Sequence, residues 1–194
     1  MLKVLFVIWS LERGGAERFL VALLKNIDLK EIKPTVCCLN WKGDFAKEVE
    51  QRGIRVIALH KKPGLDLWML IRLYLLMRRE RFDIVNTHLW AADSLGRIAA
   101  VLAQVPHIVC TLQNVDLWKG QAHWFLDRLL VSRTRMFIAV SKAVADYYAQ
   151  KIRIPKGKLT IIPNAIEIAP YEQECESAPT NRSPGKAKPC SGKT

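Results

Sequence analysis

Two neighbouring glycines follow the first apolar run of the chain. Val4 to Ile8 is apolar, and a polar turn then ends in Gly14-Gly15, directly before a helical pattern. Glycine permits positive φ and lets a ligand approach the main chain. The free N–H groups and the positive dipole at a helix start favour an anion. The stretch therefore predicts either a phosphate-binding loop, in which Arg13 would pair with a phosphate, or an ordinary turn.

Polar side chains also stand where the apolar runs end. These residues are Ser10, His88, Thr111, Ser141 and Asn164. In an open parallel sheet the carboxyl ends of the strands line one edge, where ligands bind. We therefore expect these residues to share an edge although they are far apart in the sequence. His88 could contact a substrate there, or it could be a hydrogen-bonded structural histidine.

Other titratable residues favour structural roles. Asp93 and Asp116 stand near strand ends, and each is expected to cap a helix rather than act as a base. His60, His107 and His123 show no metal-ligand spacing and are expected to be structural or exposed, so no metal site is predicted.

Strand-like and helical patterns alternate along the chain and predict an α/β fold, with a parallel sheet of about seven strands and helices on both faces. The expected strands are 3–8, 35–39, 54–59, 82–87, 106–111, 136–140 and 159–162, and the expected helices are 16–27, 44–52, 65–81, 91–103, 118–131 and 143–151.

Composition limits the class of protein and its partners. Of the net charge of +12 on 194 residues, +11 lies before Ile168, because four basic and three acidic residues occur from there onward. A basic surface attracts nucleic acid, anionic lipid or a phosphorylated substrate. The basic residues are scattered and no groove-reading motif is present, so nucleic acid is not an expected partner.

The cysteines and the hydropathy pattern indicate the cellular compartment in which the protein is expected to reside. Cys37, Cys38 and Cys110 lie in apolar strand-like runs, and the five cysteines show no paired spacing, which indicates a reducing environment. The N-terminus reads as a buried strand rather than a signal peptide, and no run reaches the roughly 18 uncharged residues of a membrane span. These features predict a cytoplasmic protein.

The segment Leu65 to Arg81 allows two interpretations. It carries many large apolar residues and ends in Arg78, Arg79 and Arg81. It could be a core-packing helix with a solvated basic end, or a helix that contacts a membrane surface, with its arginines on anionic lipid and Trp68 and Trp90 nearby.

Four motifs together resemble the N-terminal half of family 4 glycosyltransferases, retaining enzymes of the GT-B fold. They are Gly14-Gly15-Ala16-Glu17-Arg18, Asn86-Thr87-His88 followed by Gly96-Arg97-Ile98-Ala99-Ala100, Val140-Ser141-Lys142-Ala143, and Ile161-Ile162-Pro163-Asn164-Ala165-Ile166-Glu167. The resemblance implies a Rossmann-like acceptor-side domain over residues 1–167. It also implies a second domain that binds the nucleotide sugar, and no metal or other cofactor.

The resemblance also implies roles for individual residues. Arg13, Gly14 and Gly15 would lie beside the donor diphosphate, and the catalytic candidates are His88 and Gln113. Gln113 stands where the family often has a histidine, and glutamine cannot carry a proton charge near neutral pH, so a positioning role is expected for it. The cleft rim would consist of Ser10, Thr111, Asn114, Ser141 and Asn164.

The resemblance ends near residue 167. Residues 168–194 are polar and are expected to be disordered, and the donor-binding domain is absent from the sequence. The first hypothesis is the acceptor-side half of an enzyme that transfers sugar from a nucleotide sugar to a lipid-linked or polysaccharide acceptor in cell-envelope synthesis. This half is expected to be inactive alone. The second is a non-catalytic binding module, or a split-enzyme subunit that pairs with a separate donor-binding domain. The third is a fragment produced by a frameshift or an early stop.

Overall fold

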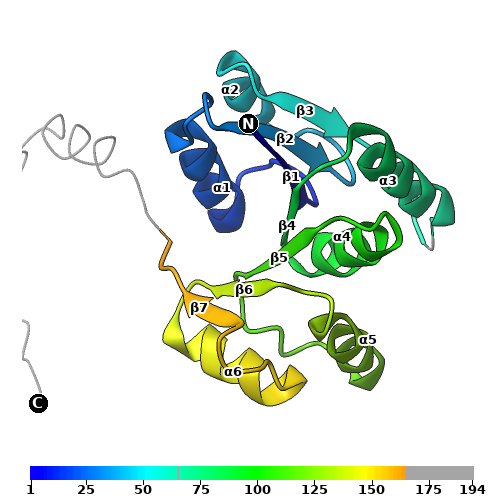
Figure 1. Cartoon of the computed structure of the whole chain (residues 1–194), viewed down its shortest axis with the longest axis vertical. Coiled ribbons are helices and arrows are strands. Elements are labelled where there is room, and N and C mark those ends of the chain that lie inside the picture. The colour runs from blue at the N-terminus through cyan, green and yellow to red at the C-terminus, as the bar shows by residue number, and fades with distance from the viewer. Residues whose placement is uncertain (65, 165–194) are drawn as a thin grey trace, which may run out of the picture.

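The computed structural model describes residues 1–64 and 66–164 (Figure 1). Seven strands form one sheet in the order β3-β2-β1-β4-β5-β6-β7, and every neighbouring pair is parallel. The strands are β1 Leu2–Ile8, β2 Ile32–Cys38, β3 Arg55–Ala58, β4 Ile84–His88, β5 His107–Leu112, β6 Met136–Ala139 and β7 Leu159–Ile161. The predicted α/β class is confirmed. The predicted tail at 168–194 lies outside the described residues.

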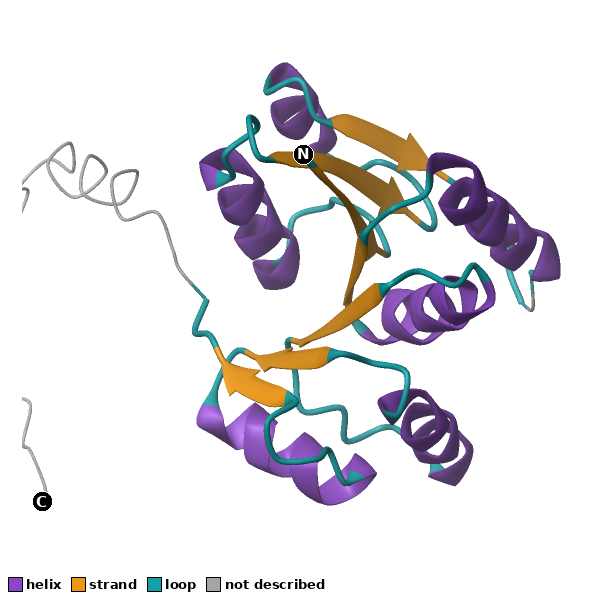
Figure 2. Cartoon of the chain, viewed as in Figure 1, coloured by secondary structure: helices purple, strands orange, loops and turns teal. Residues whose placement is uncertain are grey.

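Helices cover both faces of the sheet (Figure 2). They are α1 Gly15–Asn26, α2 Ala46–Gln51, α3 Leu67–Glu80, α4 Trp90–Leu102, α5 Gln121–Val131 and α6 Lys142–Ile152. Alternating residues of β1 serve opposite faces, since Phe6 packs in a core with Leu20 of α1, and Leu5 packs in another with Leu73 of α3. A third core, around Phe137, joins α5 and α6 to β5 and β6.

Two predicted element boundaries were wrong. Strand β2 begins at Ile32 rather than after Pro34, because the pairing of β2 with β3 starts only at Thr35 and Pro34 interrupts no pair on that side. Helix α5 begins at Gln121 rather than Trp118, because Gly120 is extended and its N–H donates to Nδ1 of His123 at 3.0 Å.

Helix α4 packs very closely on the sheet. A Cβ added at Gly96 would lie 2.7 Å from Cγ2 of Thr87 on β4. Within the described residues, no helix has the length and apolar character needed to cross a bilayer.

Candidate active site

The order in which strands are added to the sheet reverses between β1 and β4. The chain builds β1, β2 and β3 toward one side of the sheet, and β4 then pairs with the other side of β1. In such sheets the crevice at this switch point is the usual place for a ligand. Ser10, just beyond β1, and His88, the last residue of β4, both lie at this edge, and both are buried.

The glycine loop leads directly into α1. Neither Gly14 nor Gly15 has positive φ, since Gly14 is extended at φ −153° and Gly15 is the first residue of α1. Of the two properties of glycine considered above, positive φ is therefore not used in this loop. A Cβ at Gly15 would meet nothing within 4 Å. The open space at Gly15 leaves room for a ligand at the start of α1, whereas the neighbouring Gly14 is covered by the Glu17 carboxylate, whose Oε2 would lie 2.2 Å from an added Cβ.

A loop from β2 supports the glycine loop, and the sequence reasoning missed it. The N–H of Leu11 donates to the carbonyl of Lys42, and the N–H of Phe45 donates to the carbonyl of Leu11. Between them Gly43 has φ +77°, and a Cβ there would lie 2.3 Å from the carbonyl carbon of Leu11. Only glycine fits this contact. Arg13 is largely exposed and pairs with Asp44 of the same loop at 3.1 Å.

The ends of β5 and β7 meet as predicted. The side-chain amide of Asn164 donates to Oε1 of Gln113 at 3.2 Å. Thr111 Oγ1 donates to Oδ1 of Asn86 at 2.9 Å. The Nε2 group of Gln113 is buried and has no partner among the described residues, so its two N–H donors are left for a ligand or water.

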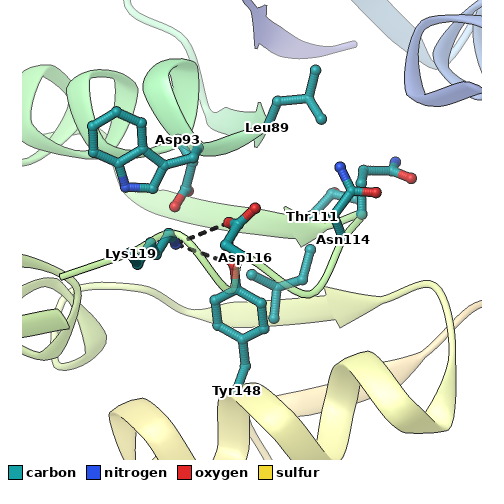
Figure 3. A pocket seen from close by; sticks show the side chains of 10 residues that line it. Leu89, Asp93, Thr111, Asn114, Asp116, Lys119 and Tyr148 are labelled. Carbon is teal, nitrogen blue, oxygen red and sulfur yellow. Dashed lines mark hydrogen bonds and ion pairs between the residues drawn. The ribbon is translucent and has the colours of Figure 1, made fainter. Parts of the chain in front are cut away.

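A small hollow lies beside Gln113 (Figure 3). Its free volume is about 20 Å³, which is room for about one water molecule. It is lined by Leu89, Trp90, Asp93, Thr111, Leu112, Gln113, Asn114, Asp116, Lys119 and Tyr148. Leu89 has φ 64° and ψ 150°, a conformation that is strained for any residue except glycine. Strained backbone conformations of this kind are common at functional sites, and the strained residue here, Leu89, directly follows His88.

A buried ionic network links α4, α5 and α6, and its members Asp93, Asp116 and Lys119 form part of the wall of the hollow. Arg97 donates to Asp93 and to Asp127, each at 2.6 Å, and Lys119 contacts Asp127 at 3.0 Å and Asp116 at 3.2 Å. The hydroxyl of Tyr148 donates to Asp116 at 2.5 Å. Two cations thus contact three carboxylates, which leaves one excess negative charge in the network. The network holds the loop between β5 and α5, which forms one wall of the hollow.

This network corrects the predicted role of both aspartates. Asp93 lies within the first turn of α4, where it accepts from Thr87 at 2.7 Å and pairs with Arg97, so it is not the N-cap. Asp116 binds Lys119 and Tyr148, while Gly120 occupies the N-cap of α5. Burial, together with the Asp116 carboxylate, raises the pKa of the Tyr148 hydroxyl well above its usual value, so this tyrosine stays protonated.

His88 is a neutral, enclosed side chain. It has no exposed surface, and neither ring nitrogen has a hydrogen-bond partner among the described residues. Burial lowers the pKa of His88 from 6.5 to about 4, although the Asp93 carboxylate opposes that shift. Its ring lies 6.2 Å from that of Phe6. A contact between His88 and a substrate would therefore require neighbouring side chains to move.

The remaining predicted residues have identifiable structural contacts. Ser141 caps α6, since its hydroxyl accepts from the N–H of Val144 at 3.3 Å. Asn114 is exposed beside the hollow, His60 and His107 are exposed, and His123 is half-buried. The edge thus offers a ligand the amides of Gln113 and Asn114 and the open backbone at Gly15. Charged groups lie there too, in the exposed Arg13–Asp44 pair and in the lining of the hollow.

Comparison with known proteins gives consistent matches. A family model described as Glycosyltransferase Family 4 matches residues 13–169. An Escherichia coli UDP-Gal:alpha-D-GlcNAc-diphosphoundecaprenol alpha-1,3-galactosyltransferase is 28% identical over 112 residues, which cover 55% of this chain and 29% of that protein.

Solved structures show the same fold. Anabaena Alr3699/HepE, in complex with UDP and glucose, has 22% identity and a TM-score of 0.71, covering 88% of this chain and 46% of that one. A glycosyltransferase from Rickettsia africae ESF-5 has 15% identity and a TM-score of 0.66, covering 93% and 50%. The chain spans half or less of the length of these relatives. Since the family model covers most of its residues, the chain belongs to Glycosyltransferase Family 4.

Proposed function

We propose that this chain is the acceptor-side domain of a retaining glycosyltransferase that transfers a sugar from a nucleotide sugar to a lipid-linked acceptor. Family membership and the printed specificity of the E. coli relative support the donor and acceptor classes. Retention of configuration comes from the family resemblance. The observation that carries the proposal is the meeting of Gln113 and Asn164 beside a hollow at the carboxyl edge.

The two parts of the edge would serve different groups of the substrates. The start of α1, left open at Gly15, would face the donor diphosphate, where a helix N-terminus favours the negative charge that develops on the leaving group. Arg13 would reach that diphosphate after leaving Asp44. Gln113 and Asn114 would hold hydroxyl groups of the acceptor sugar, since amides both donate and accept hydrogen bonds.

The other predicted residues would support this cleft. Ser10, Thr111, Ser141 and Asn164 would form its rim and hold the strand ends in place. His88 lies beneath the edge as a neutral group, and we propose that it reaches the transferred sugar only when the cleft is loaded and Leu89 leaves its strained conformation.

The 194-residue chain is proposed not to transfer sugar by itself. Enzymes of this fold close a second domain over the edge described above, and this chain covers only 46% of the Anabaena protein. A second, donor-binding domain would supply the other wall of the cleft. Enclosure matters because charge stabilisation is strongest where water is excluded.

A second candidate is a binding module without catalysis. The complete burial of His88 and the presence of Gln113, which cannot hold a proton charge near neutral pH, favour it. Both candidates share the same acceptor site, so binding and transfer have to be measured separately.

Binding is tested by NMR titration of the labelled chain with GlcNAc diphosphate carrying a short isoprenoid chain. We expect amide shifts confined to residues 86–90 and 111–116, and at least tenfold weaker binding for Gln113→Ala. The matched control is Gln51→Ala, because Gln51 is an exposed glutamine at the end of α2. Absence of binding at this edge would overturn both candidates.

Transfer is tested with radiolabelled UDP-galactose, using the chain alone and the chain mixed with the remaining part of the E. coli relative. Transfer only in the mixture supports the split arrangement. Acceptor binding without transfer in either case supports the binding module, and robust transfer by the chain alone would refute the need for a partner domain.

A further inference from the structure

Large apolar side chains are exposed on the helical layer formed by α3, α4 and α5, which lie side by side on one face of the sheet (Figure 1). Trp68 on α3 is 75% exposed, Leu102 at the end of α4 is 58% exposed, and Phe125 on α5 is 63% exposed. Leu67, Ile71, Leu75 and Leu129 of the same helices are also exposed. We define these seven residues as the apolar helix face. One such residue is ordinary on a protein surface, but a group on three adjacent helices marks an interaction site.

In helix α4 the polar side chains are buried and the least buried side chains are apolar. The least buried positions are Trp90, Ala91, Leu95, Ile98, Val101 and Leu102, whereas Asp93, Ser94 and Arg97 are buried. A helix on the surface of a water-soluble domain ordinarily directs its polar stripe outward. Leu95 and Val101 are half-buried against the core shared with α3, so the exposed contribution of α4 to the apolar helix face is Leu102.

Exposed arginines outnumber acidic side chains around the apolar helix face, although Arg72 contacts Asp66, the N-cap of α3, at 3.6 Å. Arg72, Arg78 and Arg79 of α3 and Arg128 of α5 are exposed. The acidic residues of the three helices are Glu80, which pairs with Arg55, and Asp93 and Asp127, which are buried in the ionic network. No unpaired acidic side chain of α3, α4 or α5 therefore offsets the exposed arginines.

A hollow at the rim of this face has two arginines in its wall. It has a volume of about 370 Å³ and lies between the C-terminal ends of α3 and α4. Its polar lining residues are Arg78, Arg81, Asp83 and Gln104, so two arginines face one carboxylate. An arginine presents a fork of N–H donors that matches a phosphate group. Apolar surface and phosphate-binding groups thus occur together.

We propose that the apolar helix face docks on an anionic membrane surface, with its tryptophan, leucine and phenylalanine side chains in the interface and its arginines on lipid phosphates. The sequence predicted such a contact for the Leu65 to Arg81 segment, and the structure extends it to α4 and α5. Trp90, which the sequence grouped with Trp68, is not part of it, because Trp90 is half-buried against Trp118 and His123.

The sign of the charge favours a membrane over a second copy of the chain. A two-fold dimer through this face would bring the four arginines of both copies together, and the nearby Asp66 and Glu80 already pair with arginines of their own copy. Anionic lipids complement them instead. In addition, Leu117 and Trp118, which are 81% and 58% exposed, lie just before α5 near the carboxyl edge, so a docked domain would hold its candidate site close to the bilayer.

The test is co-sedimentation of the chain with vesicles of phosphatidylcholine containing about 30% phosphatidylglycerol. The apolar variant is Trp68→Ser, Phe125→Ser and Leu129→Ser combined. Its matched control is Leu23→Ser, Leu29→Ser and Trp41→Ser, which removes exposed apolar side chains of the same size from elsewhere on the surface. We expect the apolar variant to lose at least tenfold in vesicle affinity and the control to bind like the wild type.

A charge variant separates electrostatic attraction from apolar insertion. Arg72→Gln, Arg78→Gln and Arg79→Gln combined should weaken binding about tenfold at low salt, whereas Lys30→Gln, Lys33→Gln and Lys47→Gln combined, which also remove three exposed charges, should weaken it much less. Unchanged thermal midpoints establish that the variants remain folded.

Equal binding by the variants and their controls would overturn the proposal. The proposal would also be overturned if the wild type formed a concentration-dependent dimer and did not bind the vesicles, and if the apolar variant were monomeric. No sugar or nucleotide enters this assay, so its outcome is independent of the acceptor-binding test for the proposed function.

Discussion

Arg97 is the side chain on which the buried ionic network depends. Its side chain is 1% exposed and contacts Asp93 and Asp127 at 2.6 Å each. Arg97→Met would leave both carboxylates without this partner in a buried site, so we expect a loss of about 3–5 kcal/mol in the free energy of unfolding. Urea unfolding measures it.

The control for Arg97 is an exposed ion pair. Arg55 contacts Glu80 at 2.6 Å, but its side chain is 59% exposed. Arg55→Met should change the free energy of unfolding by less than about 1 kcal/mol, because water screens exposed pairs. Equal effects of the two substitutions would mean that the network contributes nothing beyond ordinary surface pairing.

His88 should make the stability of the domain sensitive to acid. Its pKa is about 4 in the folded chain, compared with about 6.5 unfolded, so the folded state binds fewer protons. The contribution of neutral His88 is therefore complete above about pH 6.5 and is lost progressively as the pH falls toward 4. At pH 5 the expected loss is about 2 kcal/mol.

The measurement compares urea unfolding of the wild type and His88→Gln at pH 7.5 and pH 5.0. The wild type should lose about 2 kcal/mol more than the variant on acidification, since glutamine does not titrate. An NMR titration of the His88 ring provides a reading that needs no variant. Protonation of that ring near pH 6.5 would contradict the prediction.

For individual residues, the sequence predicted which side chains lie at the carboxyl edge of the sheet, but not the buried ionic network. Gln113 and Asn164 were predictable, because strand ends in a parallel sheet must meet at one edge. Arg97 and Asp127 are 30 residues apart on different helices, and no periodicity pairs them. The two aspartates were assigned as caps from local position alone, whereas their partners come from other elements.

Among the elements, α4 is the one that packs closest to the sheet. A Cβ at Gly96 would lie 2.7 Å from Thr87 Cγ2 and 3.4 Å from Val7 Cγ1, both on packed strands. Gly96→Ala gains about 1 kcal/mol in helix propensity, but it forces the helix away from β4. We expect a net loss of about 1–3 kcal/mol in the free energy of unfolding, measured by thermal or urea unfolding.

Gly15→Ala is the matched helical control. Its added methyl group meets nothing within 4 Å, so the free energy of unfolding should stay within about 0.5 kcal/mol of the wild type. A similar loss for both variants would show that helix propensity or the unfolded state, rather than contact with Thr87, determines the cost at Gly96.

The order and type of the elements could be predicted, whereas some boundaries could not. Alternating strand and helix patterns, separated by turn residues, specified all the strands and helices described. The start of β2 depends on where β3 begins to pair, and the start of α5 depends on the His123 contact with Gly120. Both are contacts between residues whose pairing the local pattern does not reveal.

Across the whole molecule, three buried cores share one sheet. Phe6 and Leu5 are adjacent on β1 but belong to cores on opposite faces. Ile108 and Cys110 of β5 likewise join the α3–α4 core to the core around Phe137. Because the same strand contributes side chains to two cores, we expect the domain to unfold as one cooperative unit.

Leu20→Ala tests this cooperativity at a distance. Leu20 is fully buried in the core beneath α1, so its truncation should cost about 2–4 kcal/mol in the free energy of unfolding. Hydrogen exchange at the protected amides of β6, in the core around Phe137, should accelerate by the same free energy, because those amides exchange only when the whole sheet opens. Leu129→Ala, at a position 57% exposed, should leave that exchange unchanged. If Leu20→Ala accelerates exchange in β1 and β2 while β6 keeps its wild-type protection, the α1 side and the α5–α6 side of the sheet unfold independently, and each end of the candidate cleft then has its own stability.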